Sequence, residues 1–304
     1  MKTNAPTPHT ETMSLNEIAH HIEANLTETL QRSGMMFRLF MRVKTLRSMR
    51  HKMKMKGDSY RAGKEIMQDI IGLRVVLYFP DDVETLNLYL SSHELVRKRE
   101  DELDVSTFRP QRLNITRSLP EAYVEAFRKA LPEDIAPFID NTYEVQIRTI
   151  FSEGWHEIEH DMRYKCKQDW VGCEDYSRRL NGVSATLEMA EWSIKSIFHE
   201  MAYRNYKFHD YRSMLRNKMR IRLQDDDFSP AVSQFLNEHP ELANTFINMD
   251  RMVFMMSLLG HKNPLPLTYD NILFLFNRME GMNDELQALE SPEIRAQLEA
   301  FLLS

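Results

Sequence analysis

Cysteine, glycine and long apolar runs are all scarce in this sequence. Its 304 residues include two cysteines, Cys166 and Cys173, which excludes a disulfide framework and fits a reducing, cytoplasmic compartment. No apolar run approaches the roughly 18 residues that a membrane-spanning helix needs. The initial stretch MKTNAPTPHTETM lacks the apolar core of a secretory signal, so residues 1–12 are expected to form a disordered leader.

Glycine-rich phosphate-binding loops are absent as well. The nine glycines form neither a G-x4-G-K-[ST] pattern nor the glycine loop of protein kinases. Side chains rather than backbone amides would therefore hold any phosphate groups. The chain has a formal charge of −6, yet residues 32–64 are strongly basic. One dense basic segment in an acidic chain indicates a local anionic ligand, with a solvated helix face as the alternative.

The spacing of apolar residues predicts an α+β fold, in which helices flank a mixed β-sheet and an all-helical C-terminal region follows. Helices are expected at residues 13–33 and 35–56, with a break at Gly57-Asp58-Ser59. From residue 152 onward almost every segment has a helical pattern. The expected strands are residues 70–79, 94–99, 110–117 and 143–149.

A domain boundary is expected near Gly172, where the mixed pattern gives way to helices. Residues 13–172 would then form one domain, and residues 173–304 a helical C-terminal region. The sequence does not indicate the role of that region. A second copy of the chain or a neutralising protein partner could bind there, and no membrane contact is expected.

A basic segment carries side chains at helical spacing. Lys44, Ser48 and Lys52 lie at i, i+4 and i+8, so a helix would align them on one face. Two ammonium groups and a hydroxyl in a row suit a chain of phosphates. Arg42 adds a planar guanidinium, which forks onto phosphate or stacks on a base.

Two carboxylates accompany the predicted strands. Asp69 precedes a buried strand that contains Arg74, and Glu144 shares the polar face of another strand with Gln146 and Arg148. Carboxylates together with phosphate oxygens are suitable ligands for Mg²⁺. A carboxylate can also accept the proton of an attacking hydroxyl. These residue types point to metal-dependent phosphoryl or pyrophosphoryl transfer, with Asp69 and Glu144 as catalytic and metal-binding candidates.

Three strings carry a family resemblance. RVKTLRSMRHKM (residues 42–53), DIIGLRVVLYFPDD (residues 69–82) and YEVQIRTIFSEGWHEIEHDMRYK (residues 143–165) resemble, in order and spacing, the synthetase domain of the RelA/SpoT family. The resemblance covers under half of the chain, and the third string is the most specific. It implies a nucleotidyltransferase-like fold and a Mg²⁺-dependent pyrophosphokinase. Such enzymes transfer the β,γ-pyrophosphate of ATP to the ribose 3′-hydroxyl of GDP or GTP, and so make the (p)ppGpp alarmones of the stringent response.

The resemblance implies a role for each ATP-site candidate. Arg42 and Arg74 would sandwich the adenine of ATP, and Lys44, Ser48 and Lys52 would bind its phosphates.

It implies further roles on the acceptor side. Asp69 and Glu144 would hold Mg²⁺, and Glu144 could activate the acceptor hydroxyl. Gln146 and Arg148 would line the acceptor subsite. His160 would close the site from the following helix, with packing or solvent exposure as its alternative.

One stretch departs from the family pattern. Where the family has Gly-Tyr-x-Ser/Gly-x-His, this chain has Phe108 in place of the tyrosine and Arg112 in place of the histidine. A phenyl ring still stacks on a base, but the hydroxyl and the titratable imidazole are lost. An adenosine nucleotide or the 3′ end of a tRNA therefore remains an alternative acceptor, as in toxin-like relatives. A non-catalytic nucleotide-binding regulator is the third alternative.

A competing motif overlaps the third string. Residues 156–160, His-Glu-Ile-Glu-His, match the H-E-x-x-H pattern of zinc proteases. A zinc protease needs a third ligand downstream, and no residue in the sequence stands out for that role. It would also leave the basic segment and Asp69 unexplained. The pyrophosphokinase interpretation is therefore preferred.

Overall fold

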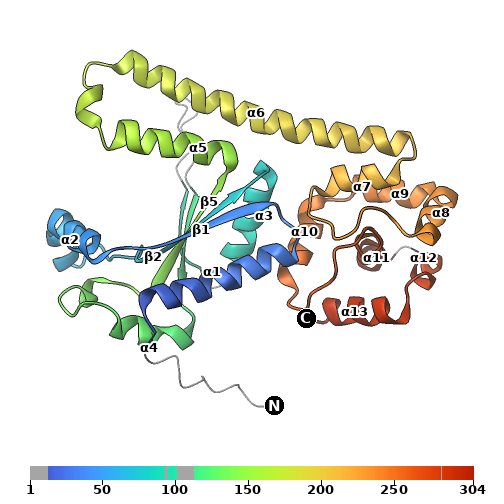
Figure 1. The fold of residues 1–304 in the computed structure, drawn as a ribbon, viewed down its shortest axis with the longest axis horizontal. Coiled ribbons are helices and arrows are strands. Elements are labelled where there is room, and N and C mark those ends of the chain that lie inside the picture. The colour runs from blue at the N-terminus through green and yellow to red at the C-terminus, as the bar shows by residue number, and fades with distance from the viewer. Residues whose placement is uncertain (1–12, 93–94, 101–112, 282) are drawn as a thin grey trace. The chain divides into compact units, whose positions relative to one another are not determined.

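The computed structural model describes residues 13–92, 95–100, 113–281 and 283–304. It contains a five-stranded sheet in the order β1-β2-β5-β4-β3, drawn with its flanking helices in Figure 1. A mixed sheet with flanking helices and a helical C-terminal region confirms the expected α+β fold. The strands are β1 (Phe37–Val43), β2 (Ile71–Leu77), β3 (Leu95–Glu100), β4 (Leu113–Ser118) and β5 (Thr142–Thr149).

The sheet combines parallel and antiparallel neighbours. β2 runs parallel to β5, whereas β4 runs antiparallel to both β5 and β3. Lys44 N donates to Ile70 O at 2.8 Å at one end of β1, and Tyr78 N donates to Met36 O at 3.2 Å at the other. These two bonds show that β1 runs antiparallel to β2.

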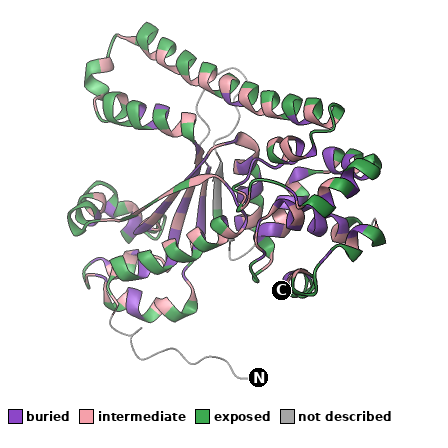
Figure 2. Cartoon of the chain, turned by 45° about the vertical axis from the view of Figure 1, so that its right-hand side comes forward, coloured by how far each residue is buried: buried purple, intermediate pink, exposed green. Residues whose placement is uncertain are grey.

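The two faces of the sheet differ because side chains alternate along each strand. Leu73 and Val75 of β2 and Val145 of β5 are buried, and buried residues run along the strands in Figure 2. Arg74 and Gln146 point to the other face and are half-buried. One face therefore contributes to the core, while the other presents polar groups.

Local capping explains where the first helix begins. Ser14 Oγ accepts a hydrogen bond from Glu17 N at 3.2 Å, and the Glu17 carboxylate accepts one from Ser14 N at 2.6 Å. This is a capping box. The helices are α1 (Leu15–Arg32), α2 (Leu46–Arg61), α3 (Pro80–Ser91), α4 (Glu121–Lys129), α5 (Ile150–Glu159), the π-helix η3 (His160–Tyr164), α6 (Glu174–Lys207), α7 (Tyr211–Met219), α8 (Pro230–Glu238), α9 (Pro240–Asn248), α10 (Arg251–Gly260), α11 (Tyr269–Glu280), α12 (Asp284–Ala288) and α13 (Pro292–Leu302).

The described chain divides into two compact units. The first comprises the described residues up to Thr27 together with Arg38–Leu77 and Leu86–Ser184. The second comprises Glu28–Phe37, Tyr78–Thr85 and Ala185–Ser304. The domain limits expected from the sequence stay a prediction. No helix among the described residues is both long and apolar enough to cross a membrane.

The expectation of a helix over residues 35–56 is wrong in its first half. Residues 37–43 form β1, in which half-buried and exposed residues alternate strictly. Leu39 and Met41 lie on the less exposed side, and Phe40 and Arg42 on the more exposed one. The period of two and the pairing with β2 outweigh the helix propensity of the individual residues.

The expected break at Gly57 is also wrong, because α2 continues through it to Arg61. A glycine inside a helix costs about 1 kcal/mol relative to alanine, which the rest of the helix can offset. α2 begins instead where Thr45 Oγ1 accepts a hydrogen bond from Ser48 N at 3.2 Å.

The second unit contains a buried ion cluster. Arg251 Nη1 lies 2.7 Å from Asp82 Oδ1 and 3.4 Å from Asp81 Oδ2, and Asp82 is fully buried. Arg220 also pairs with Asp81, and its guanidinium lies 4.8 Å from the centre of the Phe79 ring. Burial raises the pKa of Asp82, and the neighbouring Arg251 charge opposes that rise. Arg220 and Arg251 therefore supply the positive charges that face these two carboxylates.

Candidate active site

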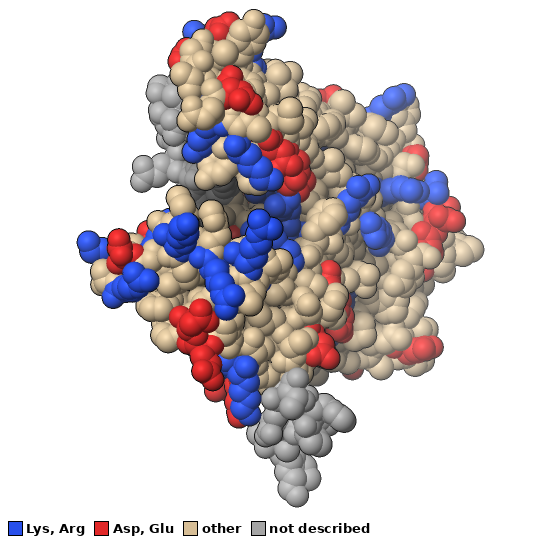
Figure 3. All heavy atoms as spheres, turned by 60° about the vertical axis from the view of Figure 1, so that its left-hand side comes forward, with Lys and Arg blue, Asp and Glu red and all other residues tan. Residues whose placement is uncertain are grey.

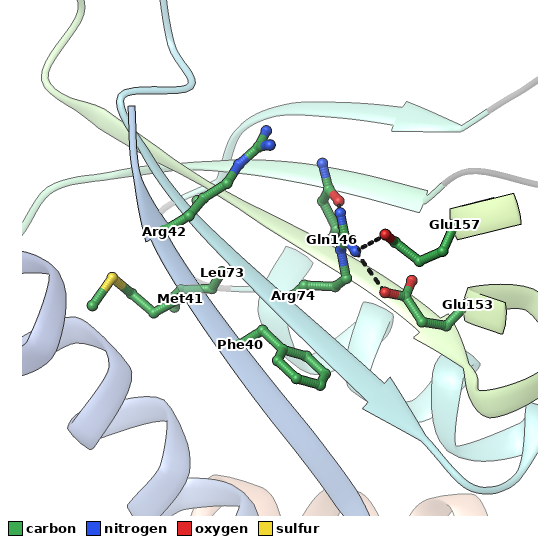
Figure 4. Close-up of a pocket in the computed structure, with 9 residues that line it drawn as sticks. Phe40, Met41, Arg42, Leu73, Arg74, Gln146, Glu153 and Glu157 are labelled. Atoms are coloured by element: carbon green, nitrogen blue, oxygen red, sulfur yellow. Dashed lines mark hydrogen bonds and ion pairs between the residues drawn. The ribbon is translucent and has the colours of Figure 1, made fainter. Parts of the chain in front are cut away.

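A cavity of about 460 Å³ lies on the polar face of the sheet in the first unit. Figure 4 shows the side chains that surround it. They come from four elements, so residues distant in sequence meet here. The lining residues are Phe40, Met41 and Arg42 of β1, Gly72, Leu73 and Arg74 of β2, Gln146 of β5, and Glu153 and Glu157 of α5.

Gly72 makes room for one of the two predicted base-stacking arginines. A Cβ atom at position 72 would lie 3.5 Å from Arg42 Nε and 3.6 Å from its Cγ, so the Arg42 side chain passes directly over β2 at this point. Arg74 lies two residues further along β2, on the same face. Both arginines line the cavity, and Figure 4 shows them extending from different strands.

Arg74 is held by three acceptors. Its Nε donates to Gln146 Oε1 at 3.2 Å, and its Nη1 donates to Glu153 Oε1 at 2.5 Å and also to Glu157 Oε1. Burial lowers the pKa of Arg74, but the hydrogen bonds and charges of the two glutamates more than compensate, and the pKa is raised. Arg148 Nη1 lies 3.4 Å from the other oxygen of Glu153.

A second cluster joins the predicted phosphate-binding lysines to Asp69. Lys44 Nζ donates to Asp69 Oδ2, and Lys52 Nζ donates to Asp69 Oδ1 at 2.9 Å. Burial alone would raise the pKa of Asp69, yet the two ammonium groups lower it to about 2. Asp69 is therefore ionised at neutral pH. Figure 3 shows Lys and Arg side chains gathered on the face of the molecule that carries α2.

The expected helical alignment of Lys44, Ser48 and Lys52 is wrong for its first member. Lys44 precedes the N-cap residue Thr45, so only Ser48 and Lys52 lie on α2. The structure nevertheless joins Lys44 and Lys52 through Asp69. The Ser48 hydroxyl lies 2.9 Å from Thr45 Oγ1, at the exposed start of the helix.

Glu144, Gln146 and Arg148 lie on one face of β5, as the alternation predicts. Gln146 Nε2 donates to Glu144 Oε1 at 2.8 Å, and Arg148 Nη2 lies 3.5 Å from Gln146 Oε1. Glu144 is paired in register with Gly72, three residues after Asp69. Three residues of extended chain span roughly 10 Å, so Asp69 and Glu144 flank the same stretch of the sheet.

The donor chemistry of this stretch fits Mg²⁺. Among the described residues, no three or more histidine, cysteine or acidic side chains are grouped closely enough to hold a metal ion by themselves. Mg²⁺ does not need such a group, since it binds through one or two carboxylates together with substrate phosphates and water. Asp69 and Glu144 would be those carboxylates.

Three predicted site residues remain, namely Phe108, Arg112 and His160. Phe108 and Arg112 lie outside the described residues. His160 is not among the lining residues; it begins the π-helix, bonds to the Asp161 carboxylate at 3.0 Å and stacks on Tyr164. His156 is buried, whereas the His160 side chain is 52% exposed, so the two do not present a shared zinc site.

Glu153 and Glu157 are the charged cavity residues that the sequence reasoning did not predict as site residues. They are separated by one helical turn in α5, directly after β5. Two acidic residues at i and i+4 behind a strand with polar side chains were the available signal. The overlapping H-E-x-x-H pattern gave Glu157 a different interpretation.

The family model described as "Region found in RelA / SpoT proteins" matches residues 41–169. The matched segment contains the cavity residues from Met41 onward and the cluster around Asp69. Residues 41–169 of this chain are thus similar to the region shared by RelA and SpoT proteins, which confirms the resemblance. No curated protein matches the sequence.

Several solved structures are similar to the chain. A GTP pyrophosphokinase family protein from Streptococcus pneumoniae is 20% identical over 61% of this chain and 94% of its own, with a TM-score of 0.43. Small alarmone synthetase 1 from Bacillus subtilis, bound to its product pppGpp, is 21% identical over 60% of this chain and 91% of its own, with a TM-score of 0.43. The same enzyme bound to AMPCPP is 21% identical over 60% of this chain and 90% of its own, with a TM-score of 0.39.

Proposed function

We propose that this chain is a Mg²⁺-dependent pyrophosphokinase that transfers the β,γ-pyrophosphate of ATP to the ribose 3′-hydroxyl of GDP or GTP. One observation carries the proposal. Arg42 of β1 and Arg74 of β2 line a cavity, and the chain that follows β1 and precedes β2 carries the ion cluster of Lys44, Lys52 and Asp69. The RelA/SpoT region supports it.

The dimensions suit ATP. A volume of about 460 Å³ falls within the roughly 300–1,000 Å³ that is usual for small-molecule sites. Lys44 follows Arg42 by two residues, which corresponds to about 7 Å of extended chain. A nucleotide with its base between the arginines would therefore direct its phosphates toward the lysines.

The cluster around Asp69 supplies charge for the phosphate chain. In the free protein the Asp69 carboxylate pairs with both Lys44 and Lys52. Phosphate oxygens would take over the two ammonium groups, and the released Asp69 carboxylate would face the metal together with Glu144. Bound Mg²⁺ neutralises charge on the transferring group. The lysines orient the β- and γ-phosphates.

The acceptor side is assigned to β5. Glu144 is the candidate to accept the proton of the attacking 3′-hydroxyl, and its hydrogen bond from Gln146 fixes the direction of the carboxylate. Gln146 and Arg148 would contact the acceptor nucleotide. A guanosine nucleotide is the proposed acceptor, with an adenosine nucleotide or a tRNA 3′ end as the outcomes that would replace it.

A transfer assay tests the proposal. Purified protein is incubated with γ-labelled ATP and Mg²⁺, and in turn with GDP, GTP, ADP, ATP and bulk tRNA. Label should move to the guanosine nucleotides and should stop when EDTA removes the metal. Glu144→Gln and Asp69→Asn should each lower the rate at least about 100-fold, because the proton acceptor or a metal ligand is lost.

A matched control uses Glu125→Gln in α4, which removes an exposed carboxylate paired with Lys129. Its transfer rate should equal that of the unmodified chain. Label on an adenosine nucleotide or tRNA alone would keep the chemistry and replace the acceptor. ATP binding without transfer to any acceptor would reject the pyrophosphokinase in favour of a nucleotide-binding regulator.

A further inference from the structure

The Nε and Nη1 groups of Arg74 donate hydrogen bonds to protein side chains rather than into the cavity. Its Nε is engaged by Gln146, and its Nη1 by both Glu153 and Glu157. A guanidinium binds phosphate through two parallel N–H groups. The two edges that carry parallel N–H groups are Nε with Nη2 and Nη1 with Nη2, and each of them has one group engaged by these contacts. Neither edge of Arg74 can bind phosphate through two N–H groups while the contacts persist, whereas the flat face of the guanidinium stays available for stacking.

The glutamates also balance the charge of the cavity. Glu153 is 15% exposed and contacts both Arg74 and Arg148. Glu157 reaches Arg74 from the next turn of α5, and Figure 4 shows both carboxylates approaching the guanidinium from the α5 side. Carboxylates beside a cavity repel phosphate and tolerate an uncharged base.

We infer that Glu153 and Glu157 are positioning residues that turn Arg74 into a stacking platform for a purine base and exclude phosphate from this subsite. The inference rests on the proposed function, since it specifies which part of ATP the cavity accepts. Arg42, which lies over Gly72, supplies the second stacking surface. A guanidinium over an aromatic ring contributes roughly 0.5–2 kcal/mol, but only when its plane is held parallel to the ring.

Glu157 is the better position for a substitution. Its side chain is 55% exposed, and Glu153 continues to neutralise Arg74 when Glu157 is lost. Glu157→Gln keeps the size of the side chain and removes its charge. The substitution should therefore loosen the orientation of Arg74 without leaving a buried charge unpaired.

Calorimetric titration with two ligands tests the inference. The ligands are a non-hydrolysable ATP analogue and inorganic tripolyphosphate, each with Mg²⁺. Glu157→Gln should bind the ATP analogue roughly tenfold more weakly, since the base loses an ordered platform. It should bind tripolyphosphate equally or more tightly, because a carboxylate that repels phosphate is removed from the cavity. Glu125→Gln should leave both affinities unchanged.

Opposite responses to the two ligands separate positioning from a structural role. A parallel loss of both ligands would assign Glu157 to structure and overturn the inference, as would an unchanged affinity for the ATP analogue. If Glu157→Gln does not fold, the same two affinities are measured for Glu157→Asp, whose side chain keeps its charge but is too short to reach Arg74 in the same way. An unmodified chain that binds tripolyphosphate but not the ATP analogue would refute the proposed function itself.

Discussion

The ionisation of Asp69 should make the folding free energy of the protein depend on pH at acidic pH values. Its pKa is about 2 in the folded chain against 3.8 for the free side chain, because Lys44 and Lys52 hold the carboxylate ionised. The difference of about 1.8 pKa units corresponds to roughly 2 kcal/mol of folding free energy. The carboxylate is about one-quarter exposed, so solvent screens only part of this interaction.

The direction follows from the lowered pKa. A carboxylate with a depressed folded pKa stabilises the protein at pH values above 3.8, and this contribution disappears as the pH falls from 3.8 toward 2. About half of it, or roughly 1 kcal/mol, should be lost between pH 7 and pH 3. Asp69→Asn cannot titrate, so it should lack this component.

Urea unfolding of the unmodified chain and of Asp69→Asn, at pH 7 and at pH 3, measures the effect. The stability difference between the two proteins should shrink by about 1 kcal/mol at the lower pH. The constant cost of leaving two lysines without a carboxylate cancels from this comparison. Glu125→Gln serves as the exposed control. A stability difference that is the same at both pH values would refute the assigned ion cluster.

Two further predictions concern packing. Gly72→Ala should leave ATP affinity nearly unchanged, because its Cβ would meet Arg42 at ordinary contact distance. Gly72→Leu should displace Arg42 and lower ATP affinity at least about tenfold in the same calorimetric assay. Equal affinities for both variants would contradict the proposed position of Arg42. Arg251→Leu should destabilise the second unit by about 3–5 kcal/mol, since it leaves the buried Asp82 without its partner. Thermal unfolding measures this loss, and an unchanged melting temperature would contradict the ion cluster.

Strong local patterns made much of the sheet predictable. The apolar run around Val75 and the alternation around Val145 each predicted a strand, and both strands lie in the centre of the sheet. β1 was missed because it lies next to a basic segment with helical spacing, so two periodicities competed over a short range. An edge strand depends on its pairing with β2, which no local window contains.

The candidate site was predictable in its parts and not in its connections. Spacing indicated Lys44 and Lys52 as partners, but as neighbours on one helix rather than as two ligands of Asp69. The contact of Arg74 with Glu153 and Glu157 depends on how α5 leaves β5, and sequence alone does not give that geometry. The roles assigned to these residues remain predictions.

The most direct test of the central claim is a crystal structure of the protein with Mg²⁺ and a non-hydrolysable ATP analogue. The account predicts the adenine between Arg42 and Arg74, with the phosphates on Lys44 and Lys52. A base bound elsewhere, or phosphates seated on Arg74, would contradict it.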